Sequence, residues 1–243
     1  MSIVEHISRD LARQGDRERA SGAKAYLKSD LDFFGVTAPI LRKTVLAIER
    51  AQPLPSRTAL FHVVTELWKR GVFELRAAGV ELLMHRDDLV TTASLPALQK
   101  LVRDSYTWAL VDPLSTAVLG TLYEREPSIA KTLDAWAAHD DFWVRRAAML
   151  AHLKQLRRGD GDFTRFARYA DAMLDEREFF IRKAIGWVLR ETSKKRPELV
   201  ATWLAPRMTR ASGVTLREAL KYLPAARRTQ LLRGRPSRKN ASE

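Results

Sequence analysis

Apolar residues recur three or four positions apart along most of this chain. A clear example is the set Leu75, Ala78, Gly79, Leu82 and Leu83. This spacing places apolar side chains on one face of an α-helix, whereas a half-buried strand requires strict alternation, which rarely extends beyond four residues here. The sequence therefore predicts an all-α fold.

Short polar, glycine-containing or proline-containing stretches repeatedly interrupt the helical pattern. Most intervals between them have room for one or two helices. These stretches are PLP (53–55), KRG (69–71), HRDD (85–88), REP (125–127), RRGDGD (157–162), KKRP (194–197) and SG (212–213). The apolar periodicity ends after Leu232, so we predict one domain at 1–232 and a basic, disordered tail at 233–243.

A helical unit repeats along the chain. FWVRRAA at 142–148 matches FFIRKAI at 179–185 with an offset of 37 residues, and FELRAA at 73–78 is a looser copy. The missing copy falls inside SYTWALVDPLS at 105–115. Units of roughly 35 to 40 residues are typical of HEAT and armadillo repeats, which stack helix pairs into a curved solenoid with a concave binding face. We therefore predict an α-α superhelix of HEAT-like repeats, with a helical bundle as the alternative.

The charge of the chain indicates a polyanionic partner. Lys and Arg number 42 against 29 Asp and Glu, which gives a formal net charge of +13. Nucleic acid on a basic concave face fits this balance, and an anionic membrane surface is the weaker alternative. There is no long apolar run, and the N-terminal residues are too charged for a signal peptide. We expect a soluble, cytoplasmic protein that does not bind membranes.

Several classes of chemistry have no sequence support. The chain lacks cysteine, which excludes disulfides, thiolate catalysis and cysteine-rich zinc sites. Its five histidines never form an HxxxH or HExxH pair, and no phosphate-binding glycine motif is present. We therefore expect neither a metal ion nor a cofactor.

The segment 178–194 predicts a helix with two different stripes. One stripe is apolar and should pack inward: Ile181, Ala184, Ile185 and Val188. The other mixes aromatic and basic residues: Phe180, Lys183, Trp187, Arg190 and Lys194. A large aromatic usually fills a groove against a neighbouring helix. Because cations flank Trp187, we favour contact with a phosphate backbone, which makes Lys183 and Arg190 candidate DNA-binding residues.

Arg145 and Arg146 allow two interpretations. They could form ion pairs with the carboxylates at 140–141, as surface arginines commonly do. Alternatively, a guanidinium could bind a phosphate through its two parallel N–H groups. The basic pair recurs at 182–183 in the next repeat, so stacked repeats would space these charges along one face. We favour phosphate contact.

The stretch SYTWALVDPLS raises the question of what Asp112 does. One answer is local: Asp112 caps a helix that Pro113 begins, because a carboxylate accepts unpaired N–H groups and proline fits the first helical position. The other is chemical: a carboxylate one helical turn from Trp108 is directed at a cation. The local sequence allows both.

Four segments resemble the AlkD-like DNA alkylation repair family, whose members are HEAT-like-repeat DNA glycosylases. The resemblance extends from Lys24 to Leu220 with similar spacing between segments, and the last segment is the most specific. The segments are FFGVTAPILRK (33–43), WALVD (108–112), DDFWVRRAAMLAHLK (140–154) and EFFIRKAIGWVLRE (178–191).

The resemblance assigns roles to individual residues. Asp112 resembles the catalytic aspartate of the family, and Trp108 and Trp187 resemble the two tryptophans that flank it. Arg146 resembles an arginine that contacts the DNA backbone near the lesion, and two further DNA-facing positions are Tyr26 and Lys154. Several relatives have a second Trp directly before the Trp108 position, where this chain has Thr107, and here Pro113 follows the aspartate.

The family implies a monofunctional enzyme that removes N3- or N7-alkylated purines from double-stranded DNA without a deep base pocket. Such a base is already cationic, so it leaves without protonation. An anion is needed instead, to stabilise the oxocarbenium-like sugar and to orient water, and Asp112 is suited to this task. We expect a monomer that associates with the nucleoid, because a basic groove must stay open for duplex DNA.

Two other functions fit parts of the pattern. A HEAT-like protein that binds distorted or branched DNA without catalysis would share the basic and aromatic residues, with Asp112 only as a helix cap. A protein-binding scaffold would fit the repeats but leaves the charge unexplained. Asp112 discriminates between the first two functions, since an anion facing phosphates only weakens DNA binding.

Overall fold

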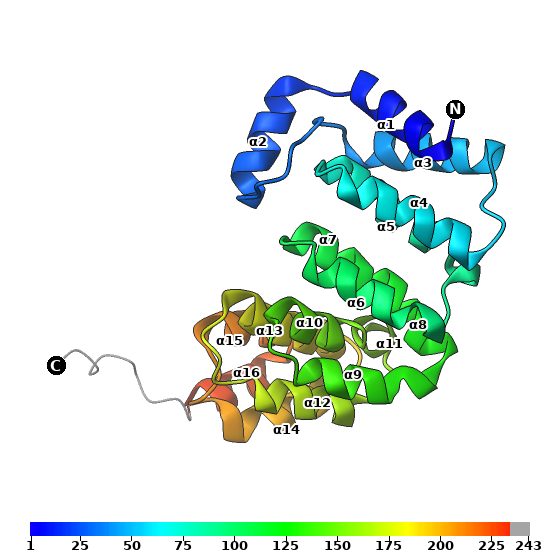
Figure 1. Ribbon diagram of the computed structural model, residues 1–243. Helices are drawn as coiled ribbons and strands as arrows, with labels where there is room; N and C mark the ends of the chain where they lie inside the picture. The colour runs from blue at the N-terminus through cyan, green and yellow to red at the C-terminus, as the bar shows by residue number, and fades with distance from the viewer. Residues whose placement is uncertain (234–243) are drawn as a thin grey trace. The chain divides into compact units, whose positions relative to one another are not determined.

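The computed structural model describes residues 1–233, and these residues form helices joined by short connections (Figure 1). The described part of the chain contains no strand and only one isolated bridge, between Asp32 and Val72. The predicted all-α class is therefore confirmed. The predicted tail lies outside the described residues except for Arg233, which is the last residue of a helix.

The chain divides into two compact units, Met1–Glu126 and Pro127–Glu243. We call them unit 1 and unit 2. The interval between them is the predicted break REP, where a 3-10 turn begins at Pro127. The prediction of a single domain over 1–232 stays a prediction.

In unit 1, successive helices pack against one another around a leucine-rich core. α3 contacts α1 and α5, and α5 contacts α4 and α7. The predicted apolar face of α5 is buried, and a Cβ atom at Gly79 would lie 3.3 Å from Cγ1 of Val64, which shows how closely α4 and α5 approach. The helices are α1 (Ile3–Arg13), α2 (Arg17–Leu27), α3 (Ala38–Ala51), α4 (Arg57–Lys69), α5 (Phe73–His85), α6 (Leu95–Arg103), α7 (Trp108–Pro113) and α8 (Gly120–Arg125), with 3-10 turns η1 (Asp87–Leu89) and η2 (Thr92–Ser94) and a π-helical segment η3 (Leu114–Leu119).

In unit 2, α13 lies at the centre and contacts α10, α11, α14 and α15. Gly186 permits the contact with α15, because a Cβ atom there would lie 2.8 Å from Cβ of Glu218 and 2.9 Å from the carbonyl oxygen of Thr215. The helices are α9 (Ala130–Ala137), α10 (Phe142–Leu150), α11 (Leu153–Arg158), α12 (Phe163–Ala172), α13 (Phe179–Ser193), α14 (Pro197–Leu204), α15 (Gly213–Ala219) and α16 (Ala225–Arg233), with 3-10 turns η4 (Pro127–Ile129) and η5 (Ala205–Arg207).

The repeated segments occupy equivalent places. Each opens a helix with an aromatic residue: Phe73 in α5, Trp108 in α7, Phe142 in α10 and Phe179 in α13. In unit 1, α5 and α7 belong to the series α3, α5, α7, and in unit 2, α10 and α13 belong to the series α10, α13, α15. In both series each helix contacts the next one. The prediction of a helical-repeat fold is confirmed.

Candidate functional site

Asp112 lies inside a helix, so the alternative in which it caps a helix beginning at Pro113 is wrong. α7 begins at Trp108, four residues before Asp112, and Oγ1 of Thr107 accepts the N–H of Ala109 at 3.4 Å. Thr107 supplies the cap because its backbone is extended, with φ of −150°. Pro113 is the last residue of α7, and the helical path continues without a break.

Two hydroxyl groups pair with backbone carbonyls beside Pro113. A proline inside a helix removes one backbone hydrogen bond, and here the chain widens directly into the π-helical segment η3. The hydroxyl of Ser115 donates to the carbonyl of Val111, and the hydroxyl of Thr116 donates to the carbonyl of Asp112 at 2.8 Å. Asp112 is therefore held by a continuous helix on both sides.

Trp108 and Asp112 lie on the same face of α7, because they are four residues apart. Both are partly exposed, whereas Leu110 and Val111 of the same helix are fully buried. The ring of Tyr26, from α2, meets Trp108 edge-on with centroids 6.1 Å apart, and Tyr26 itself is 74% exposed. Unit 1 thus brings together three of the predicted residues: two aromatic rings and a carboxylate that solvent can reach.

The two arginines at the start of α10 are engaged within unit 2. Arg146 is only 2% exposed; its guanidinium donates to the carbonyl of Phe180 and lies over that ring, 5.9 Å from its centroid. Arg145 donates to the carbonyls of His139 and Asp140, both at 2.7 Å, and pairs with Glu176 at 2.9 Å. Both side chains tie α10 to neighbouring segments, and their contact with phosphate stays a prediction.

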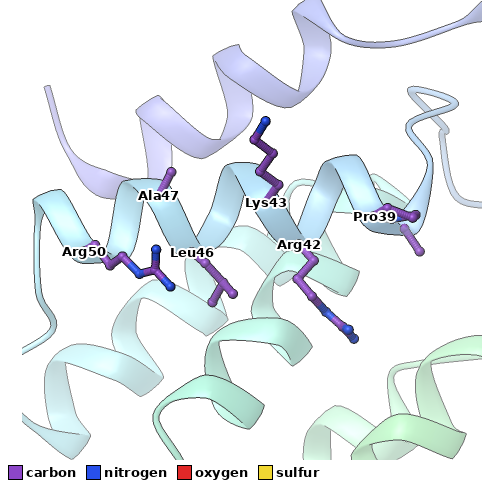
Figure 2. A pocket seen from close by; sticks show the side chains of 7 residues that line it. Pro39, Arg42, Lys43, Leu46, Ala47 and Arg50 are labelled. Carbon is purple, nitrogen blue, oxygen red and sulfur yellow. The ribbon is translucent and has the colours of Figure 1, made fainter.

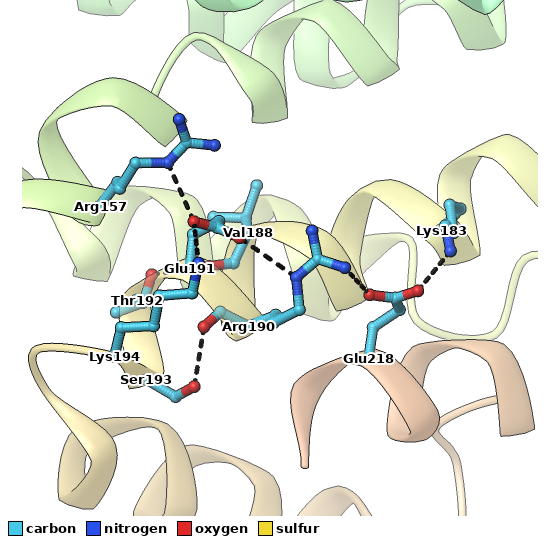
Figure 3. A network of polar contacts seen from close by, with 9 residues as sticks. All are labelled: Arg157, Lys183, Val188, Arg190, Glu191, Thr192, Ser193, Lys194 and Glu218. Atoms are coloured by element: carbon cyan, nitrogen blue, oxygen red, sulfur yellow. Dashed lines mark hydrogen bonds and ion pairs between the residues drawn. The ribbon is translucent and has the colours of Figure 1, made fainter. Parts of the chain in front are cut away.

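The two stripes predicted for α13 differ in burial as expected. Ile181, Ala184, Ile185 and Val188 are fully buried. On the other stripe Trp187 is partly exposed, but Lys183 and Arg190, which flank it, both pair with Glu218 of α15 (Figure 3). Burial acts to raise the pKa of Glu218, but the hydrogen bond from Lys183 and the charges of Arg190 and Lys183 outweigh it, so the pKa is lowered. The two cations are therefore held in place by one ionised carboxylate.

A second glutamate continues this network along α13. Glu191 has a side chain only 5% exposed and pairs with Arg157 at 3.0 Å, Arg190 at 3.1 Å and Lys194 at 2.8 Å (Figure 3). Burial acts to raise its pKa, but these three cations lower it overall. Four basic side chains thus surround two glutamates, which leaves an excess of positive charge beside Trp187. Lys154, the remaining candidate, lies partly buried in α11.

The two units differ in charge. Residues 1–126 contain 17 basic and 16 acidic side chains, whereas residues 127–243 contain 25 and 13. Nearly all of the net charge therefore belongs to unit 2, which also holds Trp187 and the predicted DNA-binding cations. Asp112 and Trp108 belong to the nearly neutral unit 1.

Unit 1 nevertheless has a basic groove of about 580 Å³ along α3 (Figure 2). Arg42 forms a two-point ion pair with Glu81 at 3.0 Å, whereas Lys43 and Arg50 have no ion-pair partner among residues 1–233. Figure 2 shows Lys43 pointing away from Arg42 and Arg50. The groove offers positive charge that can receive an anion.

Sequence reasoning missed the glutamates that organise unit 2. Glu218 lies 35 residues after Lys183, so no local spacing indicates the pair. It also missed Tyr106, an exposed residue with φ of +53° directly before the cap of α7. Residues 1–233 hold no group of His, Asp or Glu side chains arranged for a metal ion. No helix in this part of the chain is long and apolar enough to cross a membrane.

Comparison with known proteins gives one family match and several structural matches. The family model described as DNA alkylation repair enzyme matches residues 7–223. A predicted DNA alkylation repair enzyme from Enterococcus faecalis aligns with a TM-score of 0.78 and 22% identity, covering 87% of this chain and 98% of that one.

Two structures from Streptococcus mutans, smu.31 and AlkD2, each align with a TM-score of 0.54 over 92% of this chain and 100% of theirs, at 16% and 18% identity. No match was found among curated proteins. The structural matches support the helical-repeat fold.

Proposed function

Because this chain belongs to the family of DNA alkylation repair enzymes, we propose that it is a monofunctional DNA glycosylase. Its substrates are purines that alkylation at N3 or N7 has made cationic, in double-stranded DNA. It hydrolyses the bond between the base and deoxyribose, and it acts as a monomer.

The position of Asp112 is the observation that best supports this proposal. Asp112 is an internal residue of α7, and its carboxylate lies on the partly exposed face that carries Trp108. Thr107, and not Asp112, serves as the cap. An anion on a DNA-binding surface repels phosphates, so it weakens the DNA affinity of a protein that only binds DNA. The alternative of binding without catalysis gave Asp112 the role of helix cap, and Thr107 fills that role.

The reaction can be written with Asp112 as its only ionisable group. The bond between the base nitrogen and C1′ of the sugar breaks, and its electron pair neutralises the positive charge of the base. The sugar becomes an oxocarbenium-like cation, which the negative charge of Asp112 stabilises. Water then attacks C1′ and its proton passes to the carboxylate. No acid is needed for the departing base.

Aromatic and basic residues would hold the DNA. Trp108 and Trp187 present π faces to the cationic nucleotide, each contact contributing about 0.5 to 2 kcal/mol depending on desolvation. The excess charge of unit 2, around Lys183 and Arg190, attracts the phosphate backbone.

The site also supports capture of the lesion at the surface. A small cavity of about 250 Å³ between α3, α5 and α7 is lined by Ala109 and Pro113 of α7, but not by Trp108 or Asp112. Selectivity would come from the glycosidic bond, because only a labile bond breaks with this limited assistance.

The test is release of free base from methylated duplex DNA by the wild type and by Asp112→Asn. We expect release to fall by about 100-fold or more, because the stabilising charge is lost, while DNA binding is unchanged or tighter. Asp30→Asn removes an exposed carboxylate of the same unit and should behave like the wild type. Absence of release by the wild type, or equal release by Asp112→Asn, would contradict the proposal.

A further inference from the structure

Tyr106 has an unusual backbone conformation for an aromatic residue. Its φ is +53°, and the only other non-glycine residue with positive φ in residues 1–233 is Lys28. The left-handed region is unfavourable for an L-residue, and bulky side chains are rare there. Such strain persists only where the surrounding structure enforces it.

The Tyr106 side chain makes few contacts within the protein that could offset this unfavourable backbone conformation. The side chain is 69% exposed, and it forms no hydrogen bond or ring contact with any residue in 1–233. A residue at this position, two before the first residue of α7, often packs on the fourth helical residue, here Val111. Val111 is fully buried, so the exposed tyrosine does not serve as this hydrophobic staple.

The surrounding loop is tightly held. Nη1 of Arg76 donates to the carbonyl of Asp104 at 2.6 Å, and the carboxylate of Asp104 pairs with Lys100 at 2.7 Å. Ser105 is fully buried and its hydroxyl donates to the carbonyl of Leu101 at 2.7 Å. On the other side Thr107 is the cap of α7. The ring of Tyr106 is therefore presented to solvent by a fixed backbone.

We propose that the ring of Tyr106 stacks on a DNA base next to the nucleotide that faces Asp112. The inference rests on the proposed function for the identity of that nucleotide. Tyr106 stands two residues before Trp108, which already contacts the exposed ring of Tyr26, so three aromatic residues gather at the start of α7. Every base has a π face, so an aromatic ring can stack, without regard to sequence, on a base whose face is uncovered where the duplex is unstacked at the lesion. A ring fixed in advance loses little entropy on binding.

The experiment compares Tyr106→Gly, Tyr106→Asn and Tyr106→Phe. Glycine and asparagine tolerate positive φ, so both variants should melt at or above the temperature of the wild type. Both lack the ring and should bind a duplex containing an alkylated purine roughly 10-fold more weakly. Tyr106→Phe keeps the ring and should bind like the wild type. Base release should show the loss in KM and much less in kcat.

The outcomes separate this inference from the proposed function. Wild-type affinity in Tyr106→Gly and Tyr106→Asn overturns stacking, even if the wild type releases base. An equal loss in Tyr106→Phe also overturns it, because the hydroxyl would then be the binding group. If the wild type releases no base but the two ringless variants bind DNA more weakly, the proposed function fails and the contact of Tyr106 with DNA stands.

Discussion

Glu218 shows how much one residue changes the meaning of its neighbours. Lys183 and Arg190 stand beside Trp187 on the stripe predicted to contact DNA, and both are paired with this carboxylate. The pKa of Glu218 is lowered from its ordinary value of 4.5, so the carboxylate is ionised at any pH above 4.5. The stability that these ion pairs contribute is therefore fully present above pH 4.5 and is lost as the pH falls through the lowered pKa. Glu218 both orders the two cations and reduces their attraction for phosphate.

We predict that Glu218→Gln tightens binding to undamaged duplex DNA. The amide keeps the shape of the side chain but removes the negative charge, so about 2- to 5-fold higher affinity is expected, with a lower melting temperature. Fluorescence anisotropy at low salt measures the effect. Glu198→Gln removes an exposed carboxylate of the same unit and is the matched control. Weaker binding by Glu218→Gln would mean that ordering the cations matters more than freeing them.

At the scale of elements, the contact of α13 with α15 depends on the absence of a side chain at Gly186. The backbone of Thr215 and Cβ of Glu218 lie too close to admit a Cβ atom. The same contact places Glu218 against Lys183 and Arg190. Helix packing in unit 2 therefore determines the charge arrangement around Trp187.

We predict that Gly186→Ala destabilises the protein by about 1 to 3 kcal/mol, because α15 must move away from α13. Gly22→Ala is the matched control: it lies in α2, where a Cβ atom meets nothing within 4 Å. Alanine is the better helix former, so this variant should gain about 0.5 to 1 kcal/mol. Denaturant unfolding measures both changes, and equal stability of the two variants would contradict the packing argument.

At the scale of the whole molecule, charge and candidate chemistry belong to different units. Unit 1 carries Asp112, Trp108 and Tyr106 and is nearly neutral, whereas unit 2 carries the excess of basic residues. Attraction to DNA should therefore be dominated by unit 2, while most of the groups proposed to take part in the reaction belong to unit 1.

We predict that the affinity for undamaged duplex falls steeply between 50 and 200 mM salt, because DNA binding releases counterions, by roughly 10³-fold or more for a protein making six or more phosphate contacts. The double variant Lys183→Gln/Arg190→Gln should reduce the slope of log affinity against log salt. Lys43→Gln/Arg50→Gln removes the same charge from the groove of α3 and should change the slope less. A larger change of slope in Lys43→Gln/Arg50→Gln than in Lys183→Gln/Arg190→Gln would place the main phosphate contacts in unit 1.

Local sequence determined the class of fold and the family. Period-3.6 spacing, the repeated segments 142–148 and 179–185, and the four segments that resemble the family can all be read directly from the sequence. The buried stripe of α13 followed from the same spacing. Net charge required only counting.

Tertiary structure alone decided which polar groups meet. Glu218 reaches Arg190 across 28 residues, and Arg146 turns toward the carbonyl of Phe180, 34 residues away. The place of Asp112 inside α7 instead depends on local contacts, because Thr107 begins the helix and the hydroxyl groups of Ser115 and Thr116 bond to carbonyls four residues before them. Periodicity records which face of a helix is buried, but ion pairs and caps depend on which helices come into contact and where each one begins.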